Sequence, residues 1–202
     1  GAWMNKINGK YYLQYGGPGT EFKSYSDAVY TSDSPLGDYT VQPQNPFAYK
    51  PEGFAAGAGH GSTFTDDYGN LWHIGTITIS QKHMFERRLG IYPTFIDENG
   101  VLYTATQYGD YPMTLPNKKT DRPEDYFPGW MLLSYKKKVE VSSAIDSLPA
   151  THLVDEDIRT YWAAQCGGPE EFVILDLGEI LDVYAVQINF AEHQAGILGL
   201  AK

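Results

Sequence analysis

Short aromatic and β-branched segments separated by turn residues fill the first 135 residues, and this pattern constrains the fold more than any other feature. The first example is Asn8-Gly9, which lies between residues 3–7 and an aromatic run at residues 11–15. Asn and Gly both tolerate the positive φ angles of a type I′ turn, so this pair is a strong hairpin signal. We therefore expect a β-hairpin that begins almost at residue 1.

The hairpin pattern recurs along the chain. Pro35 and Gly37 occupy the second and fourth positions of an expected type I turn, and polar turns at residues 66–70 and 97–100 separate further strand-like pairs. A hairpin roughly every 30 residues without helical periodicity is typical of a sandwich, barrel or propeller. The weak self-similarity favours four-stranded propeller blades, with residues 130–135 as a strand that closes or borders the last blade.

The composition changes near the three lysines at residues 136–138. Residues 1–138 hold 13 Lys and Arg against 14 Asp and Glu, whereas residues 139–202 hold 2 against 11. This asymmetry predicts a first unit at residues 1–135 and a second unit at residues 139–202, with residues 136–138 as the linker. The chain is therefore expected to be all-β, with two successive units.

Charge and composition also exclude several classes of function. The net charge of −10 argues against a nucleic-acid partner, because phosphate binding needs a basic face. No window approaches 18 uncharged apolar residues, so no membrane span is expected. Cys166 is the only cysteine, which excludes an internal disulfide framework and a cysteine-rich zinc site.

Four segments of the first unit resemble, in this order, the later blades of a family 43 glycoside hydrolase. They are residues 3–15, 34–37, 57–74 and 83–93. This family consists of five-bladed β-propellers and includes β-xylosidases, α-L-arabinofuranosidases and arabinanases. The resemblance covers residues 1–135 and implies inverting hydrolysis of a pentose-containing plant polysaccharide. It also implies a secreted or periplasmic bacterial protein.

The second unit resembles the first half of a coagulation factor 5/8 type C (discoidin-like) module. Its landmarks are residues 152–155, 160–162 and 175–178. The resemblance implies a truncated β-sandwich or jelly roll at residues 139–202. Two strands are expected there, at residues 172–177 and 183–190. The acidic residues 155–157 are either a calcium loop of such a module or a solvated turn.

The resemblance implies that the catalytic carboxylates lie outside this chain. Enzymes of the family use an Asp base, an Asp that tunes the acid and a Glu acid, and the Glu stands immediately before the run that here reads Gly1-Ala2-Trp3. We therefore expect a piece of an enzyme that hydrolyses no glycoside by itself. Glu21 is the best remaining cleft carboxylate, with a solvated loop residue as the alternative. A non-catalytic carbohydrate-binding protein is the alternative function.

The remaining candidates bind sugar or metal. The resemblance places an arginine against the sugar, and we expect this arginine to be Arg88, with Arg87 as the second choice. The alternative is that the two arginines form a surface pair bridged to Glu86. Trp3 and Thr20 are the other candidate substrate-binding residues. His60 lies between two glycines, and the resemblance implies that it points into the central channel towards a water-clad calcium, which makes it the candidate metal residue. The alternative is a structural hydrogen-bonding residue.

Two further expectations concern packing and assembly. Trp72 and His73 are expected in the core rather than in a site. An incomplete propeller leaves a blade edge with unpaired backbone groups, so self-association through that edge is also expected.

Overall fold

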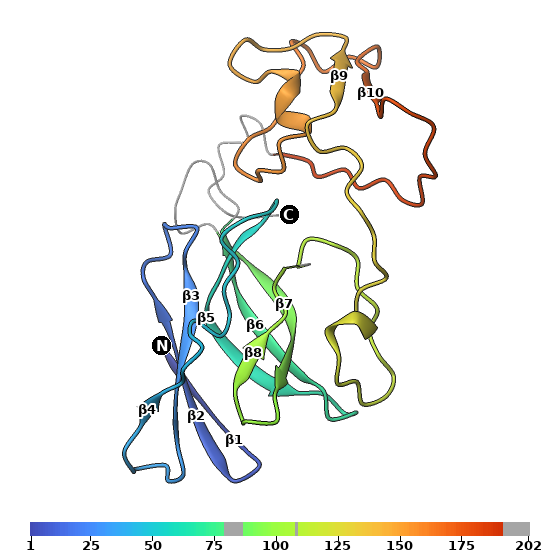
Figure 1. The fold of residues 1–202 in the computed structure, drawn as a ribbon. Helices are drawn as coiled ribbons and strands as arrows, with labels where there is room; N and C mark the ends of the chain where they lie inside the picture. Colours follow the sequence, from blue (N-terminus) through green and yellow to red (C-terminus); the bar gives the residue numbers. More distant parts are fainter. Residues whose placement is uncertain (79–86, 108, 192–202) are drawn as a thin grey trace. The chain divides into compact units, whose positions relative to one another are not determined.

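The computed structural model describes residues 1–78, 87–107 and 109–191 (Figure 1). The chain divides into two compact units, Gly1–Trp130 and Met131–Lys202. Strands and short 3-10 helices are the regular elements of the described residues, which confirms the all-β prediction. None of the described helices is long and apolar enough to span a membrane.

The first sheet of the first unit has the antiparallel order β1-β2-β3-β4. Its strands are β1 (Ala2–Ile7), β2 (Lys10–Gly17), β3 (Ser26–Ser32) and β4 (Thr40–Val41). The β1–β2 hairpin turns at Asn8 and Gly9, with φ angles of 50° and 86°. These are the positive angles that the Asn-Gly pair predicts, so the first hairpin is confirmed.

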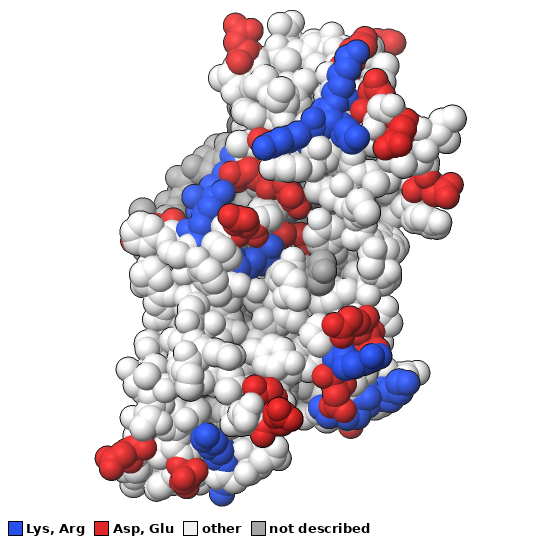
Figure 2. Space-filling model, viewed as in Figure 1, with Lys and Arg blue, Asp and Glu red and all other residues white. Residues whose placement is uncertain are grey.

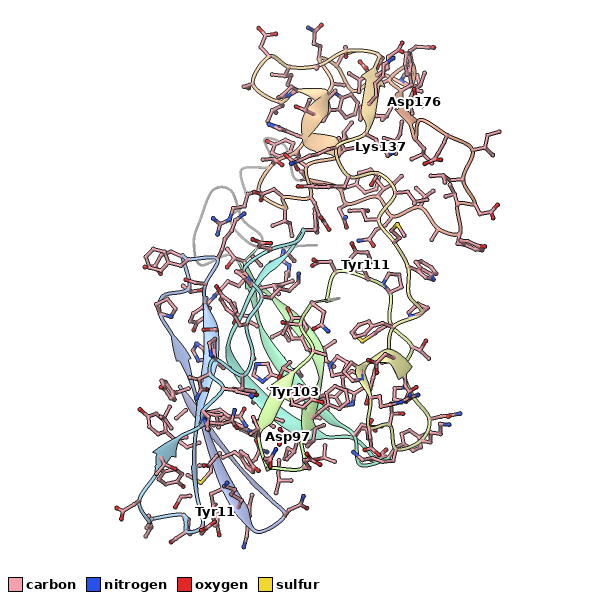
Figure 3. All side chains as sticks on the ribbon, in the orientation of Figure 1. Tyr11, Asp97, Tyr103, Tyr111, Lys137 and Asp176 are labelled. Carbon is pink, nitrogen blue, oxygen red and sulfur yellow. The ribbon has the colours of Figure 1, made fainter. Side chains whose placement is uncertain are left out.

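The second sheet is again four-stranded and antiparallel, in the order β5-β6-β7-β8. Its strands are β5 (Ala56–Thr65), β6 (Leu71–Thr78), β7 (Arg87–Ile96) and β8 (Leu102–Thr104). The β7–β8 turn is held by Asp97, whose carboxylate accepts the backbone N–H groups of Asn99 and Val101, and Figure 3 shows it near Tyr103. Two consecutive four-stranded meanders of this kind are blades of a partial β-propeller.

The core of the first unit lies between the two sheets. It joins side chains from both sheets and from the connection between them: Tyr12, Val29, Phe47, Ala48, Ala58, Tyr92 and Leu102. A second cluster forms on the other face of the β5–β8 sheet, where Tyr126 packs edge-on against Trp72 at 5.2 Å between ring centroids. Trp72 is 3% exposed and His73 is 0% exposed, so both lie in the core as expected.

Residues 130–135 form no strand, so that prediction was wrong. Gly129 immediately before them has a φ of 79°, which breaks an extended path, and Met131 remains 79% exposed. The division between the units falls at Trp130–Met131, inside this segment. The only helical element described in the first unit is the 3-10 turn η1 (Pro123–Asp125).

The second unit contains the antiparallel pair β9 (Lys138–Val141) and β10 (Val173–Asp176), with the 3-10 helix η2 (Ala150–Leu153). Strand β10 confirms the prediction at residues 172–177. The prediction at residues 183–190 was wrong, because these residues form no strand. Among the described residues no strand pairs with them, and an isolated strand is not stable in water.

Candidate functional site

Glycines let strand β5 approach its neighbours closely. The pairing of β5 with β6 shifts register twice, between Ala56 and Gly59 and between Gly59 and Ser62. A Cβ atom on Gly61 would overlap the carbonyl oxygen of Ile74 and the ring of His73. Only glycine fits at this position, so the bulged path of β5 depends on the Gly-rich sequence.

This bulge presents His60 to solvent. His60 has a φ of 54°, which is uncommon for a residue other than glycine. Its backbone N–H and that of Gly61 each donate to Asp27 at 2.7 Å, one to each carboxylate oxygen. The ring itself is exposed, and its Nε2 atom lies 3.2 Å from the backbone nitrogen of Gly1. The imidazole therefore stands beside the start of β1.

Trp3 lies on β1 close to the same bulge. Its indole Nε1–H donates to the carbonyl oxygen of Thr63 on β5 at 2.9 Å, while 44% of the residue remains exposed. Asn5 donates to the same oxygen at 3.0 Å. These bonds join the edge of one sheet to the edge of the other and leave an aromatic surface facing solvent.

The loop after β2 carries two further candidates. Thr20 accepts a hydrogen bond from the guanidinium of Arg87 through its hydroxyl at 3.4 Å, and its carbonyl oxygen accepts one from Thr78 at 3.3 Å. Arg87 pairs with Thr78 across the β6–β7 ladder. Glu21 is exposed on the same loop. The structure thus brings Thr20 and Arg87 together, beside an exposed carboxyl group.

Arg88 follows Arg87 on β7, and consecutive strand residues point to opposite faces. It is half-buried, and its guanidinium donates to the backbone oxygen of Arg87 at 3.1 Å. The predicted alternative of an ion pair with Glu86 lies outside the described residues, as does the rest of residues 83–86. The sequence placed Arg88 first, whereas the hydrogen bond to Thr20 is donated by Arg87.

Tyr25 connects the two groups of candidates. The residue is 7% exposed, and burial raises the pKa of its phenol, which Asp27 raises further while Arg87 lowers it. Both charges therefore lie near the same hydroxyl. We call Trp3, Thr20, Glu21, His60 and Arg87 the candidate face.

Asp27 and Tyr25 were missed by the sequence interpretation. Their importance comes from the pairing of strands that are far apart in the chain, and no local motif marks them. The signal that was present is the Gly-rich segment around His60, because a glycine on either side indicates a close approach of some other group.

The described residues contain no group of three or more His, Cys, Asp or Glu side chains that converge on a metal position. Calcium prefers six to eight oxygen ligands. Both oxygens of Asp27, whose carboxylate holds the backbone of His60, already accept hydrogen bonds. Among the described residues, the side chains near His60 thus form no such ligand set.

In the second unit, the carboxylates of Asp155 and Asp157 each accept the backbone N–H group two residues further along the chain. Asp155 accepts the N–H of Asp157 at 3.0 Å and the hydroxyl of Thr160 at 2.7 Å. Its carboxylate is thus engaged within a local turn.

On the face shown in Figure 2, the Lys and Arg side chains of the described residues are interspersed with Asp and Glu.

Known proteins similar to this chain are glycoside hydrolases. The family model described as glycosyl hydrolases family 43 matches residues 1–102. No curated protein matches the chain. A solved endo-1,4-β-xylanase from Bacteroides thetaiotaomicron is 28% identical with a TM-score of 0.46, and the match covers 52% of this chain and 36% of that one.

Two other solved structures are similar over comparable stretches. A xylan β-1,4-xylosidase from Bacillus halodurans is 24% identical with a TM-score of 0.48, over 61% of this chain and 26% of that one. An α-L-arabinanase from Cellvibrio cellulosa is 18% identical with a TM-score of 0.42, over 54% of this chain and 37% of that one. The chain thus spans about a quarter to somewhat over a third of these relatives' length.

Proposed function

The chain belongs to family 43 of the glycosyl hydrolases, and on this premise we propose that it supplies a sugar-binding face of a hydrolase of pentose-containing plant polysaccharides. The observation that carries the proposal is the contact of Arg87 with Thr20 beside the exposed Glu21. A guanidinium fork offers several N–H donors in one plane, which suits the adjacent hydroxyl groups of a sugar.

The other residues of the candidate face suit the same ligand. The exposed ring of Trp3 offers an amphipathic surface on which the apolar face of a sugar can pack. The exposed imidazole of His60 can donate or accept a hydrogen bond from a hydroxyl group. Arg88 remains a second candidate for contact with the sugar, from the other face of β7.

The carboxylates of this region favour binding without turnover. Inverting hydrolysis needs an acid and a base about 6.5–9.5 Å apart, with room for a water beside the base. Asp27 is 1% exposed and both of its oxygens accept backbone hydrogen bonds, so it cannot activate a water. Glu21 is the exposed carboxylate of the candidate face. This observation supports the second candidate function, a carbohydrate-binding protein without catalysis.

Hydrolysis assays separate these two functions. We expect the purified chain to release no product from aryl β-xyloside or aryl α-L-arabinofuranoside above the buffer rate, because each missing proton transfer removes about 10²–10⁴-fold in rate. Turnover that Glu21→Gln abolishes would show that Glu21 acts as the acid and that the chain is a catalyst. Turnover that survives Glu21→Gln would show that another carboxyl group of the chain acts as the general acid.

Several other features belong to the same proposal. Calcium near His60 would be held through water. The second unit would be the start of a factor 5/8 type C-like accessory module, and the protein would be secreted or periplasmic. Self-association would occur through the open edge of the incomplete propeller.

A further inference from the structure

A chain of hydrogen bonds with only one possible direction runs from β5 through β1 and β2 and back to β5. It starts at the carbonyl oxygen of Thr63, which can only accept, and which receives the side-chain N–H of Asn5 at 3.0 Å. The side-chain oxygen of Asn5 must then face Gln14, whose amide N–H donates to it at 2.8 Å. The side-chain oxygen of Gln14 in turn accepts the hydroxyl proton of Thr63 at 2.8 Å.

This direction determines the protons of His73. The Nδ1 atom of His73 lies 3.3 Å from the hydroxyl oxygen of Thr63, whose single proton is already used, so Nδ1 must carry a proton to bond there. The Nε2 atom faces two acceptors, the carbonyl oxygen of Ala58 at 3.1 Å and a carboxylate oxygen of Asp27 at 3.3 Å. Both ring nitrogens therefore face acceptors, which is the hydrogen-bonding pattern that an imidazolium satisfies.

In that protonation state, the ring of His73 and the Asp27 carboxylate form a buried ion pair. Their side chains are 0% and 1% exposed. A carboxylate buried without a counter-charge is strongly unfavourable, and a positive ring offsets part of that penalty. The other rings around His73 are uncharged: Phe47 lies edge-on at 5.1 Å between centroids, and Tyr92 pairs with His73 in the β6–β7 register.

The same carboxylate holds the backbone of His60. Its two oxygens accept the N–H groups of His60 and Gly61 at 2.7 Å, where His60 has a φ of 54°. A residue other than glycine keeps this left-handed backbone conformation only where the surrounding structure holds it there. Bonds to a charged acceptor are about twice as strong as bonds between neutral groups.

We infer that Asp27 and His73 are a buried ion pair that positions the His60 ring on the candidate face. Asp27 is thus a positioning residue that acts through the β5 backbone, and His73 supplies its counter-charge. The role of the pair in sugar binding rests on the proposed function, whereas its structure does not.

The protonation of His73 is tested directly by NMR of the full 202-residue chain labelled with ¹⁵N at histidine. At neutral pH both ring nitrogens of the buried histidine, assigned by comparison with His73→Gln, should give signals of the protonated type. One nitrogen of the unprotonated type would overturn the ion pair. This measurement is made on the unaltered chain without any sugar, and His73→Gln serves only for the assignment.

The positioning role is tested by a double-mutant cycle with Asp27→Asn and His60→Gly. Asn offers one acceptor oxygen, so one of the two backbone N–H groups loses its partner and the urea midpoint should fall. Glycine adopts positive φ freely, so Asp27→Asn should lower the midpoint less when residue 60 is glycine. An equal loss in both backgrounds would overturn the positioning role.

Affinity for a xylo-oligosaccharide distinguishes a positioning role from a purely structural one, because loss of a merely structural contact would leave the affinity unchanged. Asp27→Asn should weaken binding at least tenfold and shift the His60 ring signal. The matched control is Asp97→Asn, which weakens a carboxylate that also accepts two backbone N–H groups, in the β7–β8 turn. Asp97→Asn should change neither the affinity for the oligosaccharide nor the His60 ring signal. Equal effects of both variants would contradict the inference, whereas absence of binding by the wild type would contradict the proposed function alone.

Discussion

The β5–β6 hairpin depends on one carboxylate, and its removal should destabilise the first unit by an amount that can be worked out. Asp66 accepts four hydrogen bonds: from the backbone N–H groups of Tyr68 and Asn70, from the side chain of Asn70, and from the indole of Trp72, at 2.8–3.0 Å. Residues Asn70 and Trp72 are only 1% and 3% exposed. Asp66→Ala removes all four bonds at once.

The expected loss follows from the donors left behind. The amide of Asn70 still donates to the carbonyl oxygen of Lys118, but its backbone N–H and the Trp72 indole lose the Asp66 oxygens that accept them. A buried donor without a partner costs about 1–3 kcal/mol. Two such donors predict a loss of about 2–6 kcal/mol in the free energy of unfolding, which lowers the melting temperature by roughly 10 °C.

Urea unfolding followed by tryptophan fluorescence measures this loss. The matched control is Asp67→Ala, a neighbour in the same turn, which should change stability by less than about 0.5 kcal/mol. If both variants unfold at the same urea concentration as the wild type, the turn does not depend on the Asp66 carboxylate and the reasoning fails.

The same carboxylate predicts a dependence on pH. Partial burial raises the pKa of Asp66, but the hydrogen bonds from Trp72, Asn70 and Tyr68 outweigh it and hold the pKa below its ordinary value of 3.8. The ionised Asp66 carboxylate therefore contributes its full stabilisation when the pH is above the ordinary pKa of 3.8. That stabilisation is lost as the pH falls through the lower pKa of the folded state. Asp66→Asn should flatten the acid limb of the stability curve, whereas a limb identical to that of the wild type would contradict this.

Three further predictions concern the candidate face and assembly. Arg87→Ala should weaken oligosaccharide binding by about 1.5–3 kcal/mol, the loss typical of a charged hydrogen bond. Arg88→Ala tests the second candidate, and wild-type affinity in both variants would assign the pair to the surface. If calcium is bound near His60, a chelator should lower the melting temperature through mass action. An unchanged melting temperature would show that no calcium stabilises this site. Sedimentation should detect self-association through the open edge of the incomplete propeller, and a monomer at high concentration would exclude it.

Turn chemistry made much of the first unit predictable from sequence. Asn8-Gly9 and the polar turn at residues 66–70 act within a few residues, so the strands on either side of each could be placed without knowing the fold. The segments at residues 130–135 and 183–190 failed for the complementary reason. Each has an apolar composition typical of a strand, but a strand also needs a neighbour to pair with.

The site was less predictable, because its contacts cross the sheets. His60 was singled out by its glycines, but the carboxylate that holds it comes from Asp27 on β3, far earlier in the chain. Likewise, Thr20 and Arg87 meet only because the loop after β2 reaches the end of β6 and the start of β7. Nothing in either local sequence marks the partner.

Binding of pentose sugars by the candidate face can be followed residue by residue in an NMR titration. The ¹⁵N-labelled chain is titrated with xylo-oligosaccharides and arabino-oligosaccharides, with a cello-oligosaccharide as the control. With the pentose sugars we expect weak, saturable shifts that gather at Trp3, Thr20, His60 and Arg87. No shifts with either pentose sugar, or shifts confined to the second unit, would show that the candidate face does not bind them.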